Sequence, residues 1–254
     1  MNQLFVTNLV TMLTVMGGIA LCVAALHALE RSLARLVAQR WGWRALLVTG
    51  WVGVPLHELS HLLTACLFGH RIIHWSLLDP DPQSGTLGYV RHAYRERSLW
   101  QLFGNFWIGV APILAGGLAL GVLLSWMAPH FPLWRMHGDT LAGSLPLLGL
   151  LQDTLQSMIG LAAAVWRERT LWLPLQLYLA IAVACHMAPS WPDLQSSMGG
   201  FIVLVLLVIA LCALGAVIGV AVTPALAVVP VALWVVTAVA AFEALWALLV
   251  RTFS

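Results

Sequence analysis

One apolar run in this chain carries a cluster of polar residues. The run, residues 45–69, is long enough to cross a bilayer, yet it contains an HExxH motif from His57 to His61. In a helix the two histidines lie on one face at positions i and i+4, where both imidazoles can bind one zinc ion, with Glu58 beside the metal as a base. Because such groups are costly at membrane depth, we expect them to line a functional site.

The composition favours placement in a membrane. Of the 254 residues, 61% are hydrophobic and only 9% are charged, so the chain cannot cover itself with a polar surface. At roughly 20 residues per span, the length predicts an all-α polytopic membrane protein with about six transmembrane helices in a single domain, 1–254. The lipid bilayer is therefore one expected partner. Nucleic acid is not expected, because the arginines are spread over several loops.

The order of apolar runs predicts three parts. A first span and a basic segment occupy 1–44, and the four arginines of 31–44 lie either on a short interfacial helix or in a loop. The core occupies 45–200, and two accessory spans occupy 201–254. The run 141–166 has a polar stripe, so it either lies along the membrane surface or spans the membrane facing the bundle interior. The predicted spans are 9–29, 45–69, 99–127, 171 to about 199, 201–222 and about 226–249.

The sequence changes character between the second and third predicted spans. Segments 72–78 and 86–90 are rich in β-branched and aromatic residues, and the intervening 79–85 contains prolines and a glycine. This pattern predicts a short membrane-associated β-hairpin with a long turn.

A hydrolytic zinc site usually has three protein ligands, so a third ligand must come from another part of the chain. The candidates at plausible depth are Asp193, His186, Asp153 and Glu243. We favour Asp193, because it lies about as far from the predicted end of its span as His61 does from the end of the HExxH span. Two alternatives stay open: His186 is the third ligand, or Asp193 only caps a helix.

The residues around Asp193 resemble a known family. In the site-2 proteases, which are intramembrane zinc metalloproteases, HExxH lies on one core span and an aspartate ligand stands on a later span in a segment of the form NxxPxxPLDG. Here residues 186–194 read HMAPSWPDL: histidine replaces the asparagine, both prolines keep their spacing, and the leucine before the aspartate and the glycine after it are missing. The resemblance implies a three-helix metalloprotease core, Asp193 as a ligand, and His186 where the asparagine would hydrogen-bond near the substrate or metal.

The same resemblance implies a role for the hairpin. In this family the hairpin that follows the HExxH span offers a strand edge to the substrate. The residues expected to serve that purpose here are Ile73, Trp75, Gly88 and Tyr89.

The predicted activity is that of an intramembrane zinc metalloprotease, which hydrolyses a peptide bond in or near a transmembrane segment of a membrane-anchored protein. One Zn²⁺, held by the motif histidines and Asp193, activates water, and Glu58 accepts the proton of that water. His186 and Asn105 are the candidate donors to the developing oxyanion.

Two other functions stay open. A zinc-dependent membrane hydrolase or acyl-transfer enzyme would attack a lipid or lipoprotein, and a non-enzymatic protein would use the HExxH side chains for cation binding or transport. No inverted repeat of interrupted spans, which many transporters have, is visible in the sequence. We expect a multi-pass protein of a bacterial cytoplasmic membrane, whose substrate choice depends on the membrane core or on a regulatory membrane partner. Its orientation stays open, because the loops on both sides of the HExxH span carry four arginines each.

Overall fold

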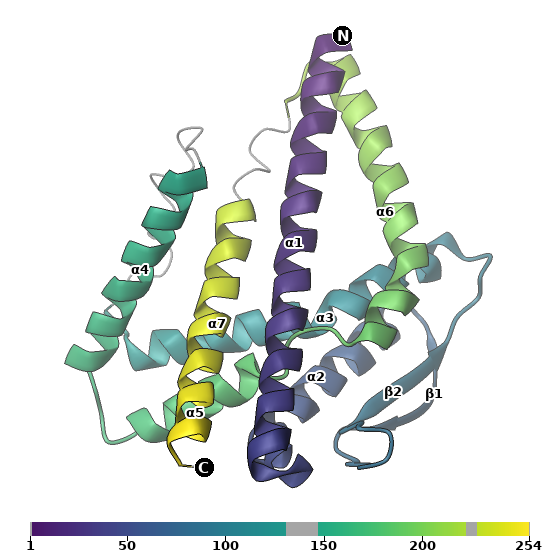
Figure 1. The fold of residues 1–254 in the computed structure, drawn as a ribbon. Helices are drawn as coiled ribbons and strands as arrows, with labels where there is room; N and C mark the ends of the chain where they lie inside the picture. Colours follow the sequence, from purple (N-terminus) through teal and green to yellow (C-terminus); the bar gives the residue numbers. More distant parts are fainter. Residues whose placement is uncertain (1, 131–146, 222–227, 254) are drawn as a thin grey trace. The chain divides into compact units, whose positions relative to one another are not determined.

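A computed structural model describes residues 2–130, 147–221 and 228–253 of the chain. The protein is 77% helical, with one small sheet of two antiparallel strands, so the predicted combination of helices and a hairpin is confirmed. Figure 1 draws the elements in chain order: α1 (Asn2–Trp41), η1 (Trp43–Leu46), α2 (Leu47–Leu67), β1 (Arg71–Ser76), β2 (Tyr89–Ala93), α3 (Leu99–Met127), α4 (Leu147–Arg167), α5 (Leu173–Ala184), α6 (Trp191–Ile218) and α7 (Val228–Thr252).

Four helices in the described part of the chain are long and apolar enough to cross a membrane. They are α1, α3, α6 and the part of α7 from Val235 to Thr252. The predicted span 99–127 is therefore confirmed as the helix α3. The helix that carries HExxH, α2, is not among the four, since the two histidines and the glutamate of the motif lower its mean hydropathy.

The basic segment 31–44 does not form a helix of its own. Its residues up to Trp41 continue α1, because leucine, alanine and arginine are good helix formers and no glycine or proline interrupts them. The helix stops before Gly42, whose φ of 84° lies in the left-handed region that favours glycine. The predicted run 141–166 is helical from Leu147 onward as α4, and 141–146 lie outside the described residues.

The predicted span from 171 to about 199 is wrong, because the chain breaks its helix there. α5 ends at Ala184, and a segment that we call the connector, residues 185–190, leads to a new helix. Pro189 explains the break, since proline has no N–H and keeps the preceding residue out of the helical conformation.

The helix that follows the connector is longer than predicted. α6 begins at Trp191 and continues to Ile218, so it merges the end of one predicted span with the accessory span 201–222 and crosses the predicted boundary after residue 200. Asp193 consequently lies in the first turn of a long helix and not near the end of a span.

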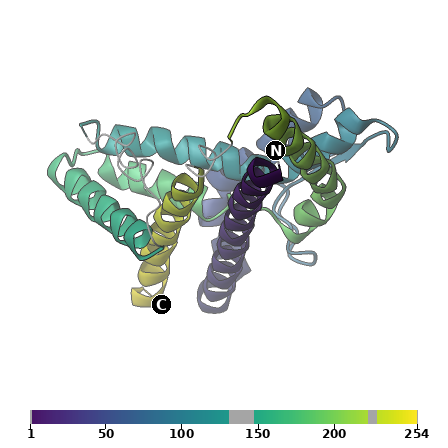
Figure 2. The same cartoon turned by 90° about the horizontal axis from the view of Figure 1, so that it is seen from above.

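The described residues divide into two compact units. The first draws on residues 2–25, 124–130, 147–173, 205–221 and 228–238. In this unit, Nδ2 of the buried Asn8 on α1 donates a hydrogen bond of 3.1 Å to the carbonyl of Val220, just after α6. The start of α1 therefore lies beside the end of α6 (Figure 1, Figure 2).

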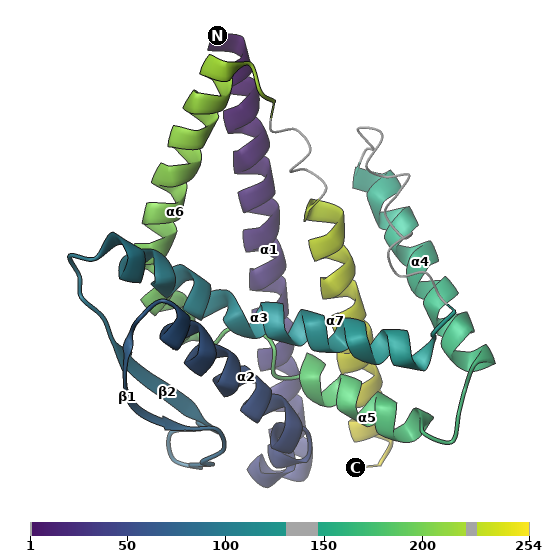
Figure 3. The same cartoon turned by 180° about the vertical axis from the view of Figure 1, so that it is seen from behind.

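The second unit comprises Leu26–Leu123, Pro174–Leu204 and Val239–Ser254, and it contains the HExxH motif, the hairpin and Asp193. α2 lies beside the two strands (Figure 3). A buried apolar cluster joins α1, α5, the connector and α7, and its members are Leu33, Val37, Ile181, Cys185 and Val250.

Close packing of α2 against α5 depends on Gly53. A Cβ at this position would collide with the carbonyl oxygen of Ala182 and would lie 2.6 Å from Cδ2 of His186. We therefore expect Gly53→Ala to lower the unfolding temperature in detergent, because relieving the overlap costs about 1–3 kcal/mol. The matched control is Gly117→Ala on α3, where the added Cβ meets nothing within 4 Å. Equal unfolding temperatures for the two variants, measured by differential scanning fluorimetry, would contradict this packing.

The hairpin differs from its prediction in the position of the second strand. β1 matches the predicted first strand closely, but β2 starts at Tyr89, three residues later than expected. Ser76 pairs with Tyr89 and Arg71 pairs with Ala93. Residues before Tyr89 belong to the long turn, where the amide of Asp79 donates to the carbonyl of Leu87 at 2.7 Å.

The end of the hairpin is fixed by two histidines. Nε2 of His70 lies 2.9 Å from the carbonyl oxygen of Gln101 on α3 and donates to it, which leaves Nδ1 of His70 to accept from Nδ1 of His92 at 3.0 Å. Burial lowers the pKa of His70, and burial together with charge on His70 and His61 lowers the pKa of His92 to about 4. Both rings are therefore neutral at pH 7, as this hydrogen bond requires.

Candidate metal centre

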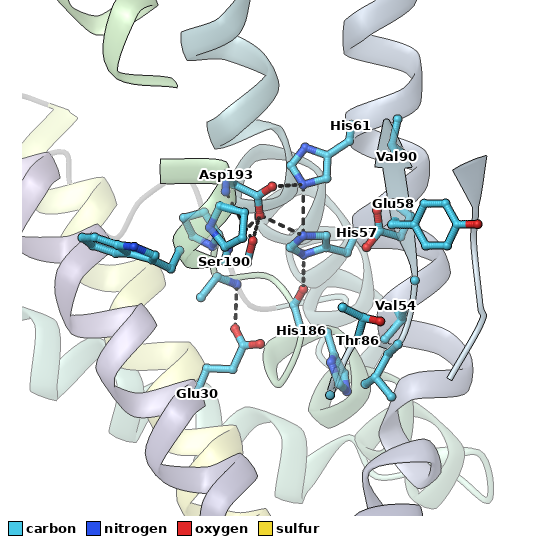
Figure 4. A pocket seen from close by; sticks show the side chains of 18 of the residues that line it. Glu30, Val54, His57, Glu58, His61, Thr86, Val90, His186, Ser190 and Asp193 are labelled. Atoms are coloured by element: carbon cyan, nitrogen blue, oxygen red, sulfur yellow. Dashed lines mark hydrogen bonds and ion pairs between the residues drawn. The ribbon is translucent and has the colours of Figure 1, made fainter. Parts of the chain in front are cut away.

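Three side chains converge in the second unit. His57 and His61 lie on successive turns of α2, and Asp193 reaches them from the start of α6 (Figure 4). The two Nε2 atoms are 3.1 Å apart, Oδ2 of Asp193 is 3.6 Å from Nε2 of His57, and Oδ1 is 3.4 Å from Nε2 of His61. All the possible ligand atoms lie within 4.8 Å of one another, so the group could hold a metal ion.

The Nδ1 atoms of the two imidazoles, on the side of each ring away from the centre, form hydrogen bonds that show where a proton lies. Nδ1 of His57 lies 2.7 Å from the carbonyl oxygen of His186, and Nδ1 of His61 lies 2.8 Å from that of Ile108. A carbonyl only accepts, so both Nδ1 atoms carry protons, and each ring turns its Nε2 atom toward the centre. The two Nε2 atoms and the carboxylate oxygens of Asp193 therefore face one common point, where a cation could be bound. Metal-binding histidines usually have such outer hydrogen bonds to carbonyls.

Asp193 also closes the first turn of α6. Its Oδ2 accepts from the amide and the hydroxyl of Ser190, at 2.8 and 2.6 Å, and its own amide donates to the Ser190 hydroxyl at 3.4 Å. This reciprocal pair is a capping box. Asp193 therefore takes part in capping α6, and the same carboxylate also faces both imidazoles.

A cavity of about 640 Å³ adjoins the three side chains. It is lined by Glu58, by the hairpin turn and the start of β2, by the connector and by the end of α1 that belongs to the second unit. Glu58 is buried, with 8% of its surface exposed. A Cβ at Gly88 would lie 2.9 Å from Cγ of Glu58, so the hairpin main chain packs directly against this glutamate (Figure 4).

The two predicted oxyanion donors, His186 and Asn105, are not part of the three-residue group. Nε2 of His186 is 3.0 Å from the hydroxyl of Thr49, and the ring is not part of the three-residue group, although it borders the cavity. The backbone carbonyl of His186 is what supports the centre. Asn105 is buried on α3 and is not among the residues that line the cavity; within the described residues its amide has no hydrogen-bond partner.

The remaining predicted residues divide between the cavity and other places. Gly88 and Tyr89 line the cavity, whereas Ile73 and Trp75 on β1 do not and are 58% and 50% exposed. Glu243 is buried on α7 and does not join the three-residue group. The side chain of Asp153 lies outside the described residues.

Two residues of α1 that the sequence interpretation left aside also contact the site. Oε2 of Glu30 accepts a hydrogen bond of 3.1 Å from the amide of Ala188, and Nδ1 of His27 lies 2.9 Å from the carbonyl oxygen of Pro189. Neither residue was among the predicted site residues. The available signal was the pair of polar residues three apart at the end of an apolar run, which places both on one helix face.

Comparison with known proteins gives no assignment: no protein-family model, no curated protein and no solved structure matches the chain. The resemblance to site-2 proteases therefore remains a prediction carried by the residues quoted for it.

Proposed function

We propose that this chain is an intramembrane zinc metalloprotease that cleaves membrane-anchored proteins in or near their transmembrane segments. The observation that carries the proposal is the convergence of two imidazole Nε2 atoms and the Asp193 carboxylate beside Glu58 in one cavity. Two histidines and a carboxylate are the ligand set of many hydrolytic zinc sites. Imidazoles whose outer nitrogen donates to a carbonyl are typical of zinc ligands, because that hydrogen bond fixes the orientation of the ring.

The proposed catalytic core consists of α2, α3 and the start of α6. α2 supplies His57, Glu58 and His61, α3 orients His61 through the carbonyl of Ile108, and α6 supplies Asp193. In this proposal the protein is multi-pass, and α2 lies at membrane depth because its polar side chains face the core and not lipid.

The chemistry divides between the metal and the protein. Bound zinc would supply a Lewis acid that lowers the pKa of water and polarises the scissile carbonyl. Glu58 then accepts the proton of the attacking water and returns it to the departing amine. Its burial against Gly88 holds the carboxylate in one position while the substrate is bound.

The hairpin gives a reason to favour a peptide substrate. A transmembrane helix keeps its carbonyls in its own hydrogen bonds, so it must unwind before attack. Main chain from Gly85 to Val90 borders the cavity and can pair with an unwound segment as an added strand. Gly88 lets that segment approach Glu58 closely.

The proposal is tested with purified protein in liposomes and single-span peptides labelled at both ends. We expect cleavage within or beside the hydrophobic segment, detected by mass spectrometry. Treatment with 1,10-phenanthroline should stop cleavage and added Zn²⁺ should restore it, because the chelator removes the metal that the three side chains hold.

Other outcomes would overturn the proposal. Release of fatty acid from the liposomes without peptide cleavage would assign the site to a lipid hydrolase. Stoichiometric metal with neither activity, across a panel of peptides of varied sequence, would assign it to a cation-binding protein.

A further inference from the structure

The connector supports two of the three side chains at the candidate centre. The carbonyl of His186 holds Nδ1 of His57 at 2.7 Å, and Ser190 fixes the carboxylate of Asp193 through its amide and hydroxyl. His61 is different, because its support comes from Ile108 on α3. Any displacement of the connector must therefore misplace His57 and Asp193 together, while His61 keeps its position.

The connector has little regular structure of its own to resist displacement. It links two helices without belonging to either, and Pro189 has no amide hydrogen that could have tied it to its neighbours. Its buried Met187 packs against Gly116 of α3, where a Cβ would lie 2.5 Å from Cβ of Met187. This apolar contact fixes the distance between the connector and α3, but it does not fix the orientation of the connector.

Besides the contacts of His186 with Thr49 and His57 on α2, two polar anchors of the connector come from α1. Oε2 of Glu30 accepts a hydrogen bond of 3.1 Å from the amide of Ala188, and Nδ1–H of His27 donates a hydrogen bond of 2.9 Å to the carbonyl of Pro189. The two side chains are three residues apart and so share one helix face. They form hydrogen bonds with two consecutive residues of the connector immediately before Ser190. Both side chains also line the cavity.

We infer that His27 and Glu30 are positioning residues that hold the connector and thereby set His57 and Asp193 for metal binding. The inference rests on the proposed metal site, and it extends that site to a helix outside the three-helix core. Outer hydrogen-bond partners of metal ligands commonly change metal affinity by about 10- to 100-fold when removed. An effect of that size is expected here, even though neither side chain touches the metal.

The test compares variants that remove each hydrogen bond with variants that keep it. Glu30→Leu and His27→Leu should weaken Zn²⁺ binding by about 10-fold or more, measured by competition with a chromophoric chelator. Glu30→Gln keeps an acceptor, and His27→Asn keeps a donor at the place of Nδ1, so both should bind close to wild type. Ser32→Ala is the matched control, since its hydroxyl bonds only to Ala28 of the same helix.

Two further readouts separate positioning from general damage. Co²⁺ bound to the Leu variants should show altered visible absorption, because His57 and Asp193 are displaced while His61 is not. Hydrogen exchange at the amide of Ala188 should rise in Glu30→Leu without zinc present. If a Leu variant does not fold, Ala replaces Leu at that position.

The outcomes distinguish this inference from the proposed function. If wild type binds Zn²⁺ and both folded Leu variants bind it equally well with unchanged Co²⁺ spectra, the positioning role is wrong and the metal site stands. If wild type binds no Zn²⁺, the proposed function fails, and exchange at Ala188 then decides alone whether Glu30 holds the connector.

Discussion

Glu58→Gln should stop peptide cleavage while leaving the metal in place. Glutamine has nearly the shape of glutamate but cannot accept the proton of the attacking water, so the rate should fall by at least about 100-fold. The Zn²⁺ content should stay at the wild-type level, because the glutamate contributes no atom to the His57, His61 and Asp193 group. Both quantities are measured on one preparation, by mass spectrometry of cleaved peptides and by elemental analysis.

The control for this variant is Glu96→Gln, an exposed glutamate in the loop before α3. Its activity should match wild type. Full activity in Glu58→Gln would exclude this residue as the base, and loss of zinc from the variant would indicate that Glu58 acts as a ligand instead.

Asp193→Asn should lower Zn²⁺ affinity by more than about 100-fold, since it loses a charged ligand and not merely a supporting group. The amide oxygen of asparagine can still accept from the amide of Ser190, so the first turn of α6 should persist and the unfolding temperature of the metal-free protein should change little. This variant therefore separates the two roles of the aspartate. Affinity is measured by chelator competition.

His186→Ala is the comparison that decides the third ligand. Its ring bonds to Thr49 and lies outside the three-residue group, so the variant should keep its zinc. His57→Ala should lose it. Retained zinc in Asp193→Asn together with loss in His186→Ala would reverse the assignment.

Local patterns in the sequence were sufficient to predict that the HExxH side chains share one helix face and that a hairpin follows them. Two histidines four residues apart can only meet on one helix face, and alternating β-branched residues around a proline-rich turn favour paired strands. The position of Asp193 beside the two histidines was also predicted, but the argument used for it was wrong. It assumed a span that continued to about residue 199, whereas α6 starts at Trp191.

A better signal was present in the same segment. Serine followed three residues later by an acidic residue, just before an apolar run, is the pattern of a capping box, and it predicts a helix start at Trp191. The support for the histidines could not be predicted. It depends on backbone carbonyls of Ile108 and His186, and any residue type offers a carbonyl.

The two carboxylate oxygens of Asp193 have different partners, and this limits which residue types can replace aspartate at position 193. Oδ2 is engaged by Ser190 and also lies 3.6 Å from Nε2 of His57, whereas Oδ1 lies 3.4 Å from Nε2 of His61 and has no other partner among the described residues. A side chain longer by one methylene, as in glutamate, would have to abandon either the helix start or the imidazoles. Position 193 therefore requires a side chain of the length of aspartate, and not a negative charge alone, to keep both sets of contacts.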